Sequence, residues 1–137
     1  MDRRCALTLA GTVVGALTLR LVAIDYGLPA IYNPDEIAIM SRALAFAKGD
    51  LNPHNFLYPT FFFYALFAWL GLYFVVARLA GWVASLNAFQ QQFFLDPSRI
   101  YVAGRTLGAA SGALTVGATA LLGRSLFDQR TALAAAV

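Results

Sequence analysis

The feature that most constrains this chain is a recurrence of apolar stretches about twenty residues long. They cover about 5–24, about 58–79 and about 97–122, and a further stretch begins at about 130 and runs to 137. Twenty residues of α-helix rise about 30 Å, which is the thickness of a hydrocarbon core. Composition agrees, since 60% of the residues are hydrophobic and 12% are charged. We therefore predict an all-α fold of transmembrane helices, with three spans and the start of a fourth.

The distribution of charge sets the expected orientation. Arg3 and Arg4 precede the first span, which predicts an inside N-terminus and places the loop at 25–57 outside. The net charge of +3 comes from arginines at span borders, so we do not interpret it as a nucleic-acid-binding surface. Residues 80–96 form a connector. We expect residues 1–137 to be the N-terminal part of one domain of a larger multi-pass protein in the cell inner (plasma) membrane.

The outer loop carries the signals of a short helix. Asn33 is a favourable N-cap, Pro34 suits the first helical position, and Gly49 supplies a C-terminal stop. Between them, apolar residues recur at helical spacing, which predicts an amphipathic helix on the outer membrane surface. The apolar stripe comprises Ile37, Met40, Leu44 and Ala47.

Two adjacent acids, Asp35 and Glu36, open this predicted helix. Acids in a first turn complement the helix dipole, and Asn33 with Glu36 resembles a capping box. A carboxylate pair just outside a bilayer can instead act as a general base on a substrate delivered from the membrane, or bind a metal or an amine. Spacing alone leaves both interpretations open.

Four other polar residues are candidates for binding or catalysis. Arg42 lies seven residues after Asp35 on the same helix face. His54 is the only histidine; a loop histidine is most often solvated, but this one could hold a phosphate or move a proton. Arg20 and Arg105 lie within apolar stretches, where an arginine either reaches toward the interface or meets a lipid phosphate.

The second and third stretches have distinct compositions. More than half of residues 56–74 are aromatic, which favours helix packing and interfacial anchoring, with a groove for a polyprenyl chain or a sugar face as the alternative. In the third stretch Gly104, Gly108 and Gly112 recur every four residues and predict close helix packing.

Several short motifs follow one another in a fixed order along the chain. They are Asp35-Glu36, Gly49-Asp50, Tyr58-Pro59, Asp96-Pro97-Ser98-Arg99-Ile100-Tyr101, Arg105-Thr106-Leu107, Gly112-Ala113-Leu114-Thr115-Val116 and Gly123-Arg124-Ser125-Leu126-Phe127. In this order and spacing they resemble the N-terminal part of the membrane-embedded GT-C glycosyltransferases. The group they resemble most is the protein O-mannosyltransferase and aminoarabinose transferase-like group, often called glycosyltransferase family 39. The resemblance extends from about residue 20 to residue 137.

The resemblance implies an enzyme that transfers a sugar from a polyprenyl-phosphate carrier to an acceptor on the outer face of the membrane. Asp35 matches the family's acidic residue in the first external loop and would be the catalytic base, with Glu36 beside it. Cationic and polar groups would bind the carrier phosphate. The candidates for that role are Arg105, His54, Arg42 and Tyr58, the last standing where many relatives carry Lys or His.

The sequence has no glycine-rich phosphate loop, zinc-ligand spacing or nucleophile elbow, so no cofactor is evident and a divalent cation stays possible. The expected partners are the lipid-linked sugar donor, membrane lipid and the rest of the polytopic protein, without which this chain is expected to be inactive. One alternative is a small transporter or channel subunit with Arg20 and Arg105 along an anion path. Another is an assembly subunit that docks through the glycine face of the third stretch.

Overall fold

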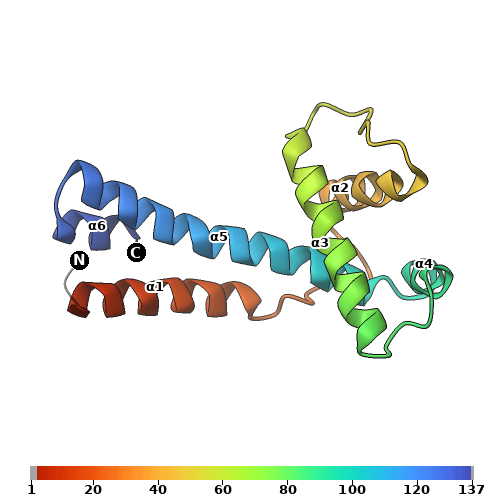
Figure 1. Ribbon diagram of the computed structural model, residues 1–137, viewed down its shortest axis with the longest axis horizontal. Helices are drawn as coiled ribbons and strands as arrows, with labels where there is room; N and C mark the ends of the chain where they lie inside the picture. Colours follow the sequence, from red (N-terminus) through yellow and green to blue (C-terminus); the bar gives the residue numbers. More distant parts are fainter. Residues whose placement is uncertain (1–2, 137) are drawn as a thin grey trace. The chain divides into compact units, whose positions relative to one another are not determined.

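The computed structural model describes residues 3–136 of the chain, apart from the side chain of residue 4. Within that range every regular element is helical, which confirms the all-α class (Figure 1). The elements are α1 (Arg3–Leu21), α2 (Pro34–Ala45), η1 (Phe46–Lys48), α3 (Thr60–Leu79), α4 (Leu86–Leu95), α5 (Ser98–Leu126) and α6 (Gln129–Ala136). They form two compact units. Unit 1 combines residues up to 24 with residues from 108 onward, and unit 2 is Asp25–Leu107.

Two helices, α3 and α5, are long and apolar enough to cross a membrane. The 29 residues of α5 extend beyond the expected end at about 122 and rise about 43 Å. The expected first span is not confirmed, because the apolar part of α1 is shorter, Cys5–Leu21. The chain leaves the helix after Leu21, and Ala23 then adopts a left-handed φ of 54°. The structure thus supports two of the three expected spans.

In unit 1 the close helix contacts occur at glycines. A β-carbon added at Gly112 of α5 would lie 2.5 Å from Nε of Arg20, so the missing side chain makes room for the end of α1. The same holds at Gly123, where an added β-carbon would lie 3.1 Å from the backbone of Ala132 in α6. Gly108, in contrast, has nothing within 4 Å of that position. The predicted packing role therefore applies to Gly112 but not to Gly108.

Unit 2 holds the larger core, where α2 packs against α3 (Figure 1). The Trp69 indole Nε1 donates to the carbonyl of Ala103 at 2.9 Å, which joins the middle of α3 to the first turns of α5. Gly104 makes room there for the Met40 side chain of α2. The buried cluster comprises Met40, Ala43, Leu66, Leu70, Ala77, Val83, Phe89, Ile100, Tyr101 and Ala103.

The ends of α2 agree with the predicted capping. Asn33 is the N-cap and its side chain accepts from the backbone N–H of Asp35, while the 3-10 turn η1 continues the helix to Gly49, whose φ is 95°. The predicted apolar stripe is partly wrong. Met40 is buried, but Ile37 is 45% exposed, and Ala43 is fully buried instead. The buried face of α2 is therefore rotated from the expected stripe, toward Glu36.

Candidate functional site

The two adjacent acids of α2 point to different neighbours. Successive residues of an α-helix project about 100° apart, so Asp35 and Glu36 cannot share one environment. Asp35 is exposed, whereas Glu36 is half-buried on the side of α2 that faces the core. Each carboxylate has a separate partner, and each partner is another residue that the sequence singled out.

Glu36 forms a two-pronged ion pair with Arg105 of α5. Arg105 Nε lies 2.6 Å from Glu36 Oε1, and Arg105 Nη2 lies 2.9 Å from Oε2. Arg105 Nη1 also donates to the carbonyl of Tyr26 at 2.9 Å. The two side chains are only 20% and 23% exposed. This fork geometry is the strong form of a charge-assisted hydrogen bond, so it ties the start of α2 to α5 and engages both oxygens of Glu36.

Asp35 accepts a hydrogen bond from Tyr58, two residues before α3 begins. The Tyr58 hydroxyl donates to Asp35 Oδ1 at 2.7 Å. This bond to a carboxylate raises the pKa of the Tyr58 phenol above its usual 10.0, because the neutral phenol is the donor. Asp35 Oδ2 accepts no hydrogen bond from the residues that the structure describes. Asp35 thus presents one fixed and one open carboxylate oxygen at an exposed position.

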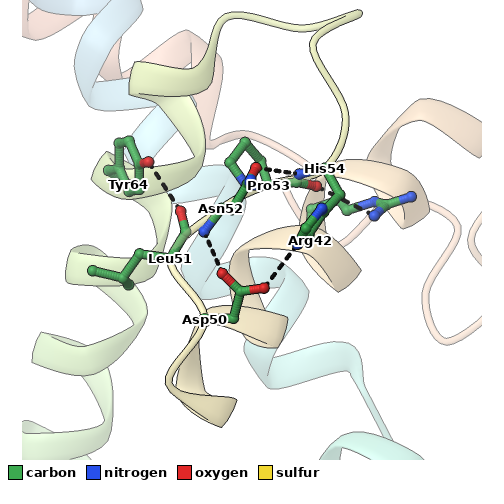
Figure 2. Close-up of polar contacts among 7 residues, drawn as sticks. All are labelled: Arg42, Asp50, Leu51, Asn52, Pro53, His54 and Tyr64. Carbon is green, nitrogen blue, oxygen red and sulfur yellow. Dashed lines mark hydrogen bonds and ion pairs between the residues drawn. The ribbon is translucent and has the colours of Figure 1, made fainter.

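The segment after α2 is held by polar contacts around Asp50 (Figure 2). Asp50 Oδ1 accepts from the backbone N–H of Asn52 at 2.8 Å, and Asp50 Oδ2 lies 2.7 Å from His54 Nε2. The hydrogen bond from His54, with that from Asn52, lowers the pKa of Asp50. Asn52 Oδ1 in turn accepts from the N–H of His54, whose φ is a left-handed 50°. These short-range bonds fix a loop that has no regular secondary structure.

Two longer contacts attach this loop to its neighbouring helices (Figure 2). Arg42 Nη1 of α2 donates to the Pro53 carbonyl at 3.2 Å, and the Tyr64 hydroxyl of α3 donates to the Leu51 carbonyl at 2.9 Å. No other N–H group of the Arg42 side chain donates to a described residue. The loop therefore has a defined shape between α2 and α3, although most of its side chains are exposed.

The six candidate residues are thus brought together as three separate groups. Asp35 pairs with Tyr58, Glu36 pairs with Arg105, and Arg42 of α2 contacts the loop of Figure 2 that contains His54. No contact among the described residues joins Arg42 or His54 to Asp35. The six still lie within unit 2.

Sequence reasoning missed three partners: Asp50, which holds His54; the Tyr26 carbonyl; and Tyr64. Only Asp50 had a recognisable signal. Asp50, Asn52 and Asn55 each accept from the N–H two residues later, the usual behaviour of Asp and Asn in turns. The other two partners depend on tertiary packing.

The part of the chain that the structure describes contains no group of three or more His, Cys, Asp or Glu residues that could hold a metal ion. Asp35 and Glu36 in particular diverge to separate partners and do not form a shared carboxylate site. No family model, curated protein or solved structure matches the chain.

Proposed function

We propose that the chain is part of a membrane glycosyltransferase that moves a sugar from a polyprenyl-phosphate carrier to an acceptor hydroxyl, with Asp35 as the base. The observation that carries this proposal is the state of Asp35. Its carboxylate is exposed, is oriented by Tyr58 through Oδ1 and leaves Oδ2 without a partner among the described residues. A general base needs this combination of fixed direction and open access. The order of motifs from Asp35 to Phe127 supplies the reaction class.

The reaction is a single displacement. The acceptor hydroxyl binds Oδ2 of Asp35 and gives up its proton as its oxygen attacks the anomeric carbon of the sugar. The bond between that carbon and the carrier's phosphate oxygen breaks, and the carrier phosphate leaves with the electron pair. The configuration at the anomeric carbon inverts. Tyr58 keeps its own proton, since the bond to Asp35 raises its pKa, and it therefore acts as a positioning residue.

Arg42 is the cation best placed to meet the leaving phosphate. It lies two helical turns after Asp35, about 10 Å along α2, a separation that a phosphate-linked sugar can bridge. Only Nη1 is engaged with a described residue, at the Pro53 carbonyl, so the rest of the guanidinium fork can approach an anion. His54 lies beside Pro53 and is a second candidate. Arg105 has the different task of anchoring Glu36.

The two apolar helices support a placement in the membrane. With α3 and α5 crossing the plasma membrane as an outward-facing multi-pass protein, Asp35 and Tyr58 lie at the outer end of α3, where a lipid-linked donor presents its headgroup. The aromatic start of α3 fits this interface, because Phe61 is 80% exposed and Phe56, just before it, is 75% exposed.

The transporter alternative has less support. It needs Arg20 and Arg105 along a water-filled anion path. Arg105 is instead paired with Glu36, and Arg20 Nη1 donates to the Ala16 carbonyl at 3.0 Å, where it packs over Gly112. The assembly alternative needs an open glycine face on α5 for a partner, but Gly104 and Gly112 already contact other side chains and only Gly108 of these three is open.

The test is sugar transfer in membranes that contain the complete enzyme of which we propose this chain is part. Radiolabelled polyprenyl-phosphate hexose and pentose serve as donors, and product is measured as label lost from the lipid phase. Asp35→Asn should reduce transfer at least a hundredfold at unchanged expression, in line with the loss of a general base. Asp96→Asn is the matched control, because Asp96 is also an exposed Asp beside a membrane helix and should have no effect. Normal transfer by Asp35→Asn would return Asp35 to a helix-capping role.

A further inference from the structure

An apolar groove runs between α3 and α5 in unit 2, away from the candidate site. Its volume is about 470 Å³, within the range of small-ligand sites, and nearly all of its lining is apolar. Trp69 and Val76 line it from α3, and Val102 lines it from α5. Trp69 is held rigidly, since its Nε1 donates both to the Ala103 carbonyl and to the Thr106 hydroxyl. The groove therefore has a fixed wall that a flexible chain can pack against.

Arg99 borders this groove with the apolar part of its side chain. Arg99, in the first turn of α5, is exposed and lines the groove together with Val76, which is near the end of α3. Asp35 and Tyr58 lie at the other end of α3, whose 20 residues rise about 30 Å. Arg78, also exposed, lies in the last turn of α3, two residues after Val76. In the membrane placement proposed above, the groove therefore lies toward the membrane face opposite Asp35 and Tyr58.

Asp96, three residues before Arg99, interacts with it electrostatically and is already engaged. Its Oδ1 accepts from the N–H of Ser98 at 3.0 Å. Asp96 and Arg99 attract one another, but no carboxylate oxygen of a described residue lies within 4 Å of the Arg99 guanidinium. The guanidinium thus remains available to an external anion, and a phosphate fits its fork.

We propose that this groove binds an anionic phospholipid, with one acyl chain against Trp69 and Val102 and the phosphate at Arg99. Apolar contact alone gives no preference in a bilayer, because every lipid offers similar chains. Selectivity must therefore come from charge, and a single arginine near a membrane surface favours an anionic lipid by about fivefold. The inference rests on the membrane placement proposed above but not on sugar transfer.

Trp69 provides a direct reporter, because bromine atoms on an acyl chain quench tryptophan fluorescence at contact distance. The full chain carrying Trp82→Phe leaves Trp69 as its only tryptophan. It is placed in nanodiscs with small, equal mole fractions of brominated phosphatidylglycerol or brominated phosphatidylcholine. Half-maximal quenching should need about fivefold less phosphatidylglycerol.

Variants separate a site from general bilayer contact. Arg99→Gln should abolish the preference, and Asp96→Asn should strengthen it by removing the competing carboxylate. Val102→Phe should weaken quenching by both lipids because it fills the groove. Arg124→Gln is the control, since this exposed arginine lies at the other end of α5 and should change nothing. Circular dichroism checks the fold of each variant.

Two results would overturn the inference. Equal quenching by both lipids, with Arg99→Gln silent, would mean unselective lipid contact and would leave the membrane placement intact. Absence of quenching by either lipid would mean that Trp69 is shielded from acyl chains, which also contradicts the membrane placement of this face. Neither result bears on the sugar-transfer assay, so the two proposals fail separately.

Discussion

The ion pair between Glu36 and Arg105 gives the sharpest test of how α2 is held. The perturbation is Glu36→Gln, which keeps the size of the side chain but removes its charge. Arg105 would then face a neutral amide while remaining about three-quarters shielded from water. Its hydrogen bond to the Tyr26 carbonyl at 2.9 Å brings no negative charge, and the Asp25 carboxylate compensates only in part, because it acts on Arg105 less strongly than Glu36 does. The substitution should therefore destabilise the docking of α2 on α5.

The hydrogen bonds and the partial exposure of the Glu36–Arg105 pair set the range of the expected loss of stability. Hydrogen bonds to charged groups contribute about 1.5–3 kcal/mol, and removing one partner of a fully buried ion pair costs about 3–5 kcal/mol. The pair here is partly exposed, at 20% and 23%, so the cost lies below that of full burial. We expect the free energy of unfolding to fall by about 2 kcal/mol, which is about a thirtyfold change in the unfolding equilibrium constant.

The assay is reversible unfolding in mixed detergent micelles, followed by circular dichroism, on Glu36→Gln, Arg105→Gln and the double variant. The double-mutant cycle should give a coupling of about 1–2 kcal/mol between the two side chains. Asp35→Asn is the matched control, because it neutralises the adjacent but exposed acid and should change stability by less than about 0.5 kcal/mol. A coupling below about 0.3 kcal/mol would refute the anchoring role, as would an Asp35→Asn effect as large as that of Glu36→Gln.

Two further predictions concern Tyr58 and the glycines of α5. The bond to Asp35 raises the Tyr58 pKa, so the contact is present below pH 10 and is lost as the pH rises through the pKa of the folded state. Asp35→Asn should therefore lower the Tyr58 pKa toward 10.0. Ultraviolet titration measures this change, with Tyr32→Phe as the control. Gly104→Leu should lower the free energy of unfolding by about 1–3 kcal/mol, because the new side chain overpacks against α2. Gly108→Leu should have no effect in the same unfolding assay, because the space around Gly108 is open. An equal loss of stability in both variants would contradict this prediction.

The local signals in the sequence were sufficient for the helix that carries the acids. Asn33, Pro34 and Gly49 correctly bounded α2 with its terminal 3-10 turn, because caps act through neighbouring backbone groups. Length and hydropathy likewise identified α3 and α5, but the expected first span is not confirmed, because α1 ends at Leu21 although the apolar run continues to Ile24. Hydropathy averages over a window and does not detect where the backbone leaves the helix.

Local signals in the sequence could not identify the partners of Asp35 and Glu36. Glu36 and Arg105 are 69 residues apart, and Asp35 and Tyr58 are 23 apart, so only the packing of α2 on α3 and α5 decides these pairings. The buried face of α2 was also ambiguous, since both Ile37 and Ala43 fit a helical stripe. The inward position of Glu36 could not be predicted, because its partner Arg105 lies 69 residues away in α5.

The pairing of the two acids explains how neighbouring carboxylates can take different roles. If Glu36 were not held by Arg105, α2 could rotate about its axis and Asp35 would lose its fixed direction. The pairing of Glu36 with Arg105 fixes that rotation, and Tyr58 then selects which oxygen of Asp35 stays open. Loss of Glu36 should therefore weaken any activity of Asp35 through disorder of α2, and the reverse should not hold. Under the proposed function, the two acids therefore divide the work: Glu36 anchors α2 and Asp35 is the base, so neither residue can replace the other.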